Sequence, residues 1–141
     1  MTANGTLTVT DADYSNTVTM SVTDVAVDAS TTGGVQTLLA GVLSNAQLKS
    51  MLTVTNTTTA LSADPTAGSQ LTWTFNSGNV SSVNNTFDFL AAGETLVLNY
   101  TLTATDSNTT AGVDTRVVTI TIRGSNDAPV ITGTSASASL D

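Results

Sequence analysis

The sequence predicts an all-β fold, a β-sandwich that carries a short helical insertion around residues 34–52. Threonine occurs 30 times, mostly beside Val, Leu or Ile, and this β-branched residue suits the solvent-facing side of a half-buried strand. Apolar and polar residues alternate strictly in several segments, which is the period of a strand. Only one long segment places its apolar residues at helical spacing instead.

The first part of the chain predicts two strands. Their apolar residues occupy alternate positions: Leu7, Val9, Val18, Met20 and Val22. The next apolar residues, Val25 and Val27, stand at odd positions, whereas Val18, Met20 and Val22 stand at even ones. Because side chains alternate between the two faces of a strand, a change of phase requires an extra residue, and we expect a bulge near Thr23-Asp24.

Residues 34–52 predict one or two short helices. Their apolar residues recur three and four positions apart: Val35, Leu38, Leu39, Val42, Leu43 and Ala46. Ser44, followed three residues later by Gln47, is typical of a capping box at a helix start. We interpret the insertion as a helical plug that closes an open end of the sandwich, and a partner-binding appendage is the alternative.

The second part of the chain predicts the remaining strands. Leu71, Trp73 and Phe75 alternate and are expected to share one strand face. Phe87 and Phe89 are expected to share another. The longest alternating run covers 96–104, and its expected partner at 118–122 ends at Arg123-Gly124. Six or more short strands separated by Gly, Asn and Asp turns fit immunoglobulin-like or Greek-key connections.

The composition argues against several classes of function. Eleven acidic residues face only three basic ones, for a net charge of −8, so we expect no binding to nucleic acid. The absence of Cys and His removes disulfides, zinc sites and thiol or imidazole catalysis. Because there are also few aromatic residues to line a glycosidase cleft, we predict that the protein is not an enzyme.

No apolar stretch is long enough to predict a membrane span. No signal peptide is visible at residues 1–4, so we interpret the chain as a piece of a longer protein.

Acidic side chains gather where the predicted strands end. Asp11 and Asp13 follow the first strand, and Asp106 ends the longest one. Side chains two residues apart on an extended backbone point the same way, so a D-x-D pair presents two carboxylates together. Calcium takes about six to eight oxygen ligands. We therefore predict a calcium site at Asp11, Asp13 and Asp106, although each Asp taken singly also fits an Asx turn.

Two segments resemble a known protein family. Residues 5–23, GTLTVTDADYSNTVTMSVT, and 87–129, FDFLAAGETLVLNYTLTATDSNTTAGVDTRVVTITIRGSNDAP, are similar to the VCBS and cadherin-like repeats of large bacterial RTX-type surface adhesins. The motifs follow in the same order: D-A-D, L-A-A-G-E, A-T-D and N-D-A-P. The resemblance implies a cadherin-like sandwich, one of many tandem modules that hold a terminal binding domain away from the cell.

The resemblance also implies calcium between successive modules. Asp11, Asp13 and Asp106 would then serve the N-terminal joint of this module. Glu94, Asn126 and Asp127 would serve the C-terminal joint, together with the D-x-D of the next copy. On this phasing residues 1–124 are one module, 125–130 a linker, and 131–141 the start of the next repeat. We expect residues 131–141 to be mobile or to pair with a neighbouring sheet edge.

The expected function is that of a structural extender, a calcium-rigidified spacer outside the bacterial cell that supports attachment to surfaces or other cells, as in biofilms. Its partners would be neighbouring repeats of the same polypeptide, and the isolated module would be monomeric. The alternative is a module of the same kind of adhesin that binds carbohydrate, peptide or ice. Trp73 is expected in the core, which leaves Tyr14 as the aromatic residue most available to a sugar.

Overall fold

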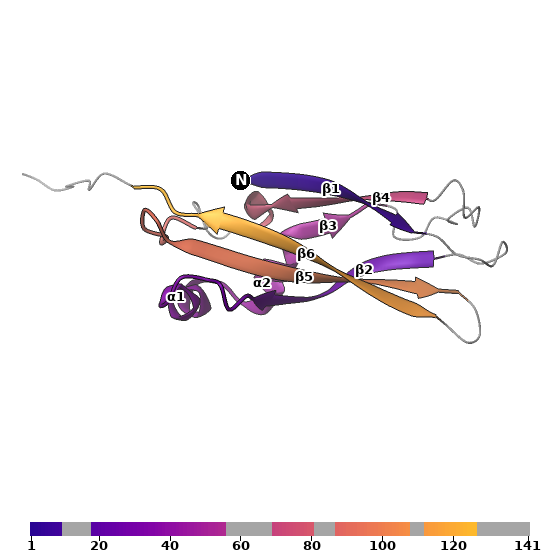
Figure 1. Ribbon diagram of the computed structural model, residues 1–141, viewed down its shortest axis with the longest axis horizontal. Coiled ribbons are helices and arrows are strands. Elements are labelled where there is room, and N and C mark those ends of the chain that lie inside the picture. The colour runs from indigo at the N-terminus through magenta and orange to yellow at the C-terminus, as the bar shows by residue number, and fades with distance from the viewer. Residues whose placement is uncertain (10–17, 56–68, 81–86, 108–111, 127–141) are drawn as a thin grey trace, which may run out of the picture.

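The computed structural model describes residues 1–9, 18–55, 69–80, 87–107 and 112–126, which form two antiparallel three-stranded sheets. One sheet has the order β1-β4-β3, and the other has the order β2-β5-β6. The strands are β1 (Thr2–Val9), β2 (Val18–Val27), β3 (Leu52–Val54), β4 (Ser69–Asn76), β5 (Thr95–Asp106) and β6 (Val113–Arg123). Figure 1 shows the two sheets as layers of one elongated molecule. The predicted all-β sandwich is confirmed at this level.

The core lies between the sheets and is richest around β5 and β6. The predicted pairing of these strands is confirmed, with Leu98 opposite Ile120 and Tyr100 opposite Val118. Tyr100 is fully buried, and its ring meets Phe75 of the other sheet edge-on at 6.2 Å between centroids. Its hydroxyl donates a hydrogen bond of 2.8 Å to the Leu48 carbonyl, so the buried polar atom is satisfied. Burial raises the pKa of Tyr100 far above its usual value.

The expected bulge in β2 is confirmed. The register against β5 shifts between Val22 and Asp24, which leaves Thr23 as the additional residue. Met20 is at an even position and Val25 at an odd one, so in a regular strand they would face opposite sides. The shift brings both to the buried side. The Thr23 hydroxyl lies 2.8 Å from that of Thr103 on β5, so the unpaired residue is still held to the sheet.

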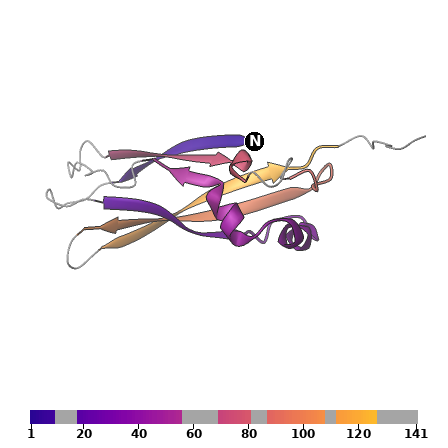
Figure 2. The same ribbon diagram turned by 180° about the vertical axis from the view of Figure 1, so that it is seen from behind.

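The helical insertion is confirmed as α1 (Val35–Val42) and α2 (Asn45–Ser50). Ser44 and Gln47 form both hydrogen bonds of the predicted capping box. Asn45 donates from its side-chain amide to the Val25 carbonyl at 2.9 Å, which fixes α2 on the edge of β2. Because α2 also contacts β3, the insertion covers the side of the sandwich where β2 and β3 meet (Figure 2). No described helix is long and apolar enough to cross a membrane.

Two features differ from the sequence-based expectation. Phe87 and Phe89 do not share a strand face, because residues 87–89 form a turn in which the two rings lie 6.3 Å apart. The short strand β3 was not predicted. Trp73 was expected in the core; it packs against the core but is only partly buried, and its ring covers Gly5 so closely that a Cβ there would lie 2.5 Å from it.

The strand β5 defines two ends of the molecule. We call them the Glu94 end, where β5 begins and β6 finishes, and the Asp106 end, where β5 finishes. Strand β1 starts in the half of the molecule that contains the Glu94 end, so both described termini lie there (Figures 1 and 2). Of the predicted linker at 125–130, only Ser125 and Asn126 are described, and the predicted next-repeat segment 131–141 lies outside the described residues.

Candidate functional site

The predicted calcium ligands divide between the two ends of the sandwich. Asp106 is the last residue of β5, and Glu94 immediately precedes its first residue. The 12 residues of β5, at about 3.3 Å each, separate them by roughly 40 Å. The two residues therefore belong to two different candidate sites, whereas Asp11, Asp13 and Asp127 lie outside the described residues.

At the Asp106 end, the chain positions agree with the predicted grouping. Asp106 pairs with Val18, the first described residue after the segment that carries Asp11 and Asp13. Val9, the last described residue before that segment, lines the same cleft as Val18 and Asp106. Among the described residues no three carboxylates come close enough to hold a metal ion. A calcium site here would therefore require ligands from residues outside the described ranges, such as Asp11 and Asp13, or from another chain.

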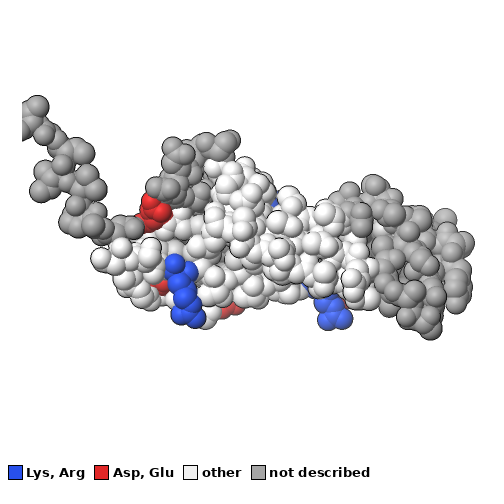
Figure 3. Space-filling model, turned by 90° about the horizontal axis from the view of Figure 1, so that it is seen from above, with Lys and Arg blue, Asp and Glu red and all other residues white. Residues whose placement is uncertain are grey.

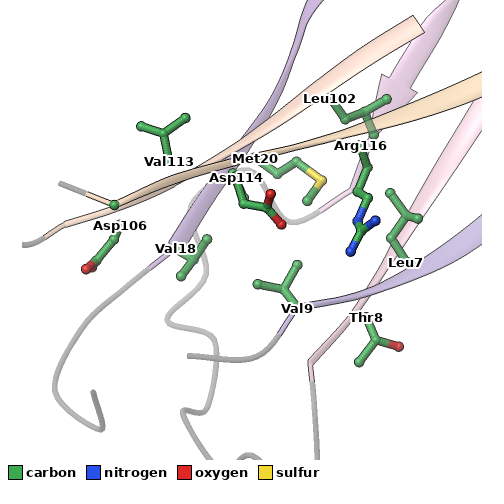
Figure 4. Close-up of a pocket in the computed structure, with 12 residues that line it drawn as sticks. Leu7, Thr8, Val9, Val18, Met20, Leu102, Asp106, Val113, Asp114 and Arg116 are labelled. Carbon is green, nitrogen blue, oxygen red and sulfur yellow. The ribbon is translucent and has the colours of Figure 1, made fainter. Parts of the chain in front are cut away.

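The cleft at this end lies between the two sheets and has a volume of about 420 Å³. Its walls include aliphatic side chains from four strands: Leu7, Val9, Val18, Met20, Leu102, Ala104 and Val113. Three charged residues also line it, namely Asp106, Asp114 and Arg116. In Figure 4, Asp114 and Arg116 extend from β6 toward the space beside Val9 and Met20. The described residues that line it include no aromatic side chain on which a sugar ring would stack.

Asp114 and Arg116 were not among the predicted site residues, although the sequence holds a signal for them. They occupy the same alternating phase of β6 as Val118 and Ile120, and this phase faces the other sheet. Val118 and Ile120 are buried, whereas Asp114 and Arg116 are exposed. The inner face of β6 is thus covered near its middle and uncovered at the Asp106 end.

At the Glu94 end, two motifs that are far apart in the sequence meet. Glu94 closes a turn with Ala91, since the Ala91 N–H donates to Glu94 Oε2 at 2.8 Å and the Glu94 N–H donates to the Ala91 carbonyl at 3.0 Å. Gly93 in this turn has φ +87°, a conformation that favours glycine. The Gly124 N–H donates to the Glu94 carbonyl at 2.9 Å, which joins the exit of β6 to the turn.

Gly124 is required by this junction. A Cβ at that position would overlap the carbonyl oxygens of Leu90 and Ala91, which belong to the backbone and have no rotamer to escape into. Asn126 is exposed two residues further on. The structure therefore brings Glu94 and the exit toward Asn126 together, but one carboxylate oxygen of Glu94 is already used to cap its own turn.

One further carboxylate, Asp28, forms a network that the sequence did not predict. Its Oδ1 accepts hydrogen bonds from the Ser30 N–H at 2.8 Å and the Ser30 hydroxyl at 2.6 Å. Its Oδ2 accepts from the Asn99 amide at 2.6 Å, and Asn99 in turn accepts from Thr119 at 2.8 Å. The Ser30 side chain, then its backbone, then Asn99 hold the pKa of Asp28 below its usual value. This is an Asx turn tied to the sheet, and its role is structural.

Charged side chains are sparse over the described surface. On the face shown in Figure 3, the basic side chains stand apart from one another, and acidic side chains appear as separate small areas. Comparisons with protein families, with curated proteins and with solved structures found no match for this chain.

Proposed function

We propose that this chain is an extender module, a calcium-rigidified immunoglobulin-like or cadherin-like sandwich repeated in tandem in a secreted bacterial surface adhesin. The observation that carries the proposal is the separation of the candidate ligands, since Asp106 and Glu94 lie at opposite ends of one continuous strand. A spacer needs its joints at its two ends and an uninterrupted rigid element between them. Strand β5, central in its sheet, supplies that element.

The donor chemistry at the Asp106 end fits calcium. Carboxylate oxygens are hard ligands of the kind that calcium prefers, and the segment with Asp11 and Asp13 connects to the described structure next to Asp106. The whole chain has only three basic residues to balance its carboxylates. Calcium at this end would neutralise part of the remaining negative charge. Its removal would leave like charges facing one another, which makes a joint between modules flexible.

At the Glu94 end, the proposal assigns Glu94, Asn126 and Asp127 to the joint with the next module. The contact between Gly124 and the turn at Glu94 supports this assignment, because it fixes the direction in which the chain leaves β6. Glu94 Oε2 already accepts the Ala91 N–H, so Oε1 and the Asn126 side chain are the oxygens left for an ion. This half of the joint would be completed only by the D-x-D of the following copy.

Thermal unfolding in excess EGTA, in about 10 mM calcium and in matched magnesium tests the proposal. Extracellular modules bind calcium at about 0.1–1 mM. One site then adds about 1.4–2.7 kcal/mol of stability, and for a chain of this length the melting temperature rises by about 3–11 °C. We expect this rise with calcium and not with magnesium.

A matched pair of substitutions locates the site. Asp106→Asn removes a proposed ligand, and Asp24→Asn removes the same charge from an exposed position of β2 that pairs with Thr101, near the middle of β5. We expect the calcium-dependent rise to shrink in the first variant and to persist in the second. An equal response of both variants would show that the ion acts only through the net charge, and an absent rise in the parent chain would remove the calcium site from the proposal.

A second candidate function is ligand binding within the same kind of adhesin, and the cleft at the Asp106 end favours it. Among the ligands considered from the sequence, the aliphatic walls fit an extended peptide better than a carbohydrate, since the described lining residues include no aromatic side chain. Tyr14, the other aromatic candidate, lies outside the described residues. Titration with extended peptides and with oligosaccharides, followed by NMR shifts of the cleft residues, separates these ligands.

A further inference from the structure

Strand β6 lies at an edge of its sheet and exposes an unusual run of residues. Within the described residues it pairs only with β5. All five residues from Val113 to Val117 are exposed, and the two valines are 62% and 60% exposed. Natural edge strands are commonly short, whereas β6 has 11 residues and carries two large apolar side chains in the open. This stretch is the part of the described surface best suited to accept another strand.

Alternate residues of β6 turn their backbone groups to the free edge. In an antiparallel ladder, residues that bond to the partner strand alternate with residues whose N–H and C=O point away from it. The Gly112 carbonyl accepts a hydrogen bond of 3.0 Å from the Asp106 N–H at the end of β5. The register between β5 and β6 continues from there without a shift. Even-numbered residues of β6 therefore bond to β5, and Val113, Thr115 and Val117 present their backbone groups to the edge.

A hydrogen bond within β6 agrees with this phase. The Thr115 N–H donates to Asp114 Oδ1 at 2.9 Å, so a side chain satisfies a donor that β5 does not take. The Asp114 carboxylate thus occupies the position of a missing strand at this point of the edge. An arriving strand would take over the Thr115 N–H and free the carboxylate for another partner.

The sequence of this stretch, Val-Asp-Thr-Arg-Val, is complementary to itself in an antiparallel pair. With Thr115 opposite Thr115 of a second copy, each Val113 meets a Val117 on the outer face. On the inner face, where Figure 4 shows Asp114 and Arg116, each Asp114 meets an Arg116 of the other copy. The odd-numbered residues exchange both backbone hydrogen bonds in this register. Asp114 and Arg116 form the non-hydrogen-bonded pairs, in which opposing side chains lie closest.

The charges select both the partner and the register. A register whose centre moves by one residue places Asp114 opposite Asp114, or Arg116 opposite Arg116, and like charges directly opposite destabilise a strand pair. Inward-pointing charges commonly protect an edge, because an unrelated strand does not match them. A second copy of the same strand does match them, so the pattern that excludes other strands accepts this one.

We propose that two copies of this chain associate through β6, antiparallel and about a two-fold axis at Thr115. The two β2-β5-β6 sheets then form one continuous sheet, joined by edge hydrogen bonds, by valines that cover one another, and by two Asp114–Arg116 ion pairs. This departs from the monomeric module expected from the sequence. The pairing does not depend on the proposed extender function, but one consequence rests on it: antiparallel modules belong to arrays that run in opposite directions, as from two facing cells.

Sedimentation of the whole chain in excess EGTA tests the association without any bridging ion. Over concentrations from about 10 µM to about 1 mM, we expect the mass to rise from 14.3 kDa toward that of two copies. A mass that stays at one copy over this range would overturn the proposal.

Charge reversal tests the register. Asp114→Arg leaves two positive side chains in this stretch and Arg116→Asp leaves two negative ones, so each variant alone should dimerise at least about 10-fold more weakly than the parent chain. An equal mixture of the two variants places opposite charges at both positions, and association should return. Asp24→Arg makes the same change of net charge on exposed β2 and should not weaken the dimer. Weakening without recovery in the mixture would overturn this register.

A disulfide locates the two-fold axis, because the chain contains no Cys. Thr115→Cys places two thiols on facing residues with Cα atoms about 5.5 Å apart, within the reach of a disulfide. Thr121→Cys, also exposed on β6, places them about 40 Å apart. On oxidation we expect linked dimers to form at least about 10-fold faster at residue 115. Equal rates would show that the copies meet elsewhere and would overturn the proposal.

Failure of this inference is distinguishable from failure of the proposed calcium function, because the association is measured in EGTA. A dimer linked at residue 115 without any calcium-dependent rise in melting temperature would retain the β6 contact and remove the ion. A calcium-dependent rise in a chain that remains monomeric would do the reverse.

Discussion

Replacement of Gly124 by Ala tests the junction that joins the exit of β6 to the turn at Glu94. A Cβ at Gly124 would overlap the carbonyl oxygens of Ala91 and Leu90, and the nearest atoms belong to the backbone of a turn already closed by Glu94. The turn must move or β6 must separate from it, and the Gly124–Glu94 hydrogen bond is lost in either case. Overpacking against a fixed structure costs about 1–3 kcal/mol, and the lost hydrogen bond adds about 1 kcal/mol. We expect a decrease in melting temperature of about 4–16 °C, measured by circular dichroism.

A matched substitution at Gly41 has the opposite expected sign. Gly41 lies inside α1, and a Cβ there meets nothing within 4 Å. Because Ala exceeds Gly in helix propensity by about 1 kcal/mol, Gly41→Ala should raise the melting temperature slightly. If Gly124→Ala melts at the parent temperature while Gly41→Ala shows its rise, β6 does not approach the turn closely and the reasoning about this junction is wrong.

Two further predictions concern the core and the Asp28 network. Tyr100→Phe removes the hydrogen bond to the Leu48 carbonyl, which also accepts the Met51 N–H; we expect a loss of about 1 kcal/mol in denaturant titration, and no loss would mean that this hydroxyl does not hold α2. The pKa of Asp28 is lowered in the folded state, so its stabilisation is present at neutral pH and is lost as the pH falls through the folded pKa. The difference in stability between the parent chain and Asp28→Asn should therefore narrow below about pH 4, and a constant difference would contradict the network.

Local patterns in the sequence were sufficient for much of the fold. The alternation in β5 and β6 predicted their pairing, and the change of phase between Val22 and Val25 placed the bulge near Thr23-Asp24, where the register shift lies. The capping box at Ser44 was visible because its two partners are three residues apart. In each case the relevant interaction lies within one element or between strands with an uninterrupted period.

Contacts between distant segments were not predictable in the same way. Asp28 and Asn99 are 71 positions apart, and nothing in their local sequence indicates that a bulged strand and a turn bring them together. Gly124 resembles an ordinary strand end until the turn at 91–94 is placed beside it. The cleft residues Asp114 and Arg116 were missed because alternation alone does not show that the inward face of β6 is exposed at the Asp106 end.

The shared location of the two described termini has a mechanical consequence. Tension applied to Met1 and Arg123 of a lone module acts at the half where Thr2 pairs with Asn76, so the β1–β4 hydrogen bonds break one after another, as a zip opens. Load applied instead between Met1 and the Asp106 end would act along the strands, and many hydrogen bonds of the β1–β4 ladder would then be strained together in shear.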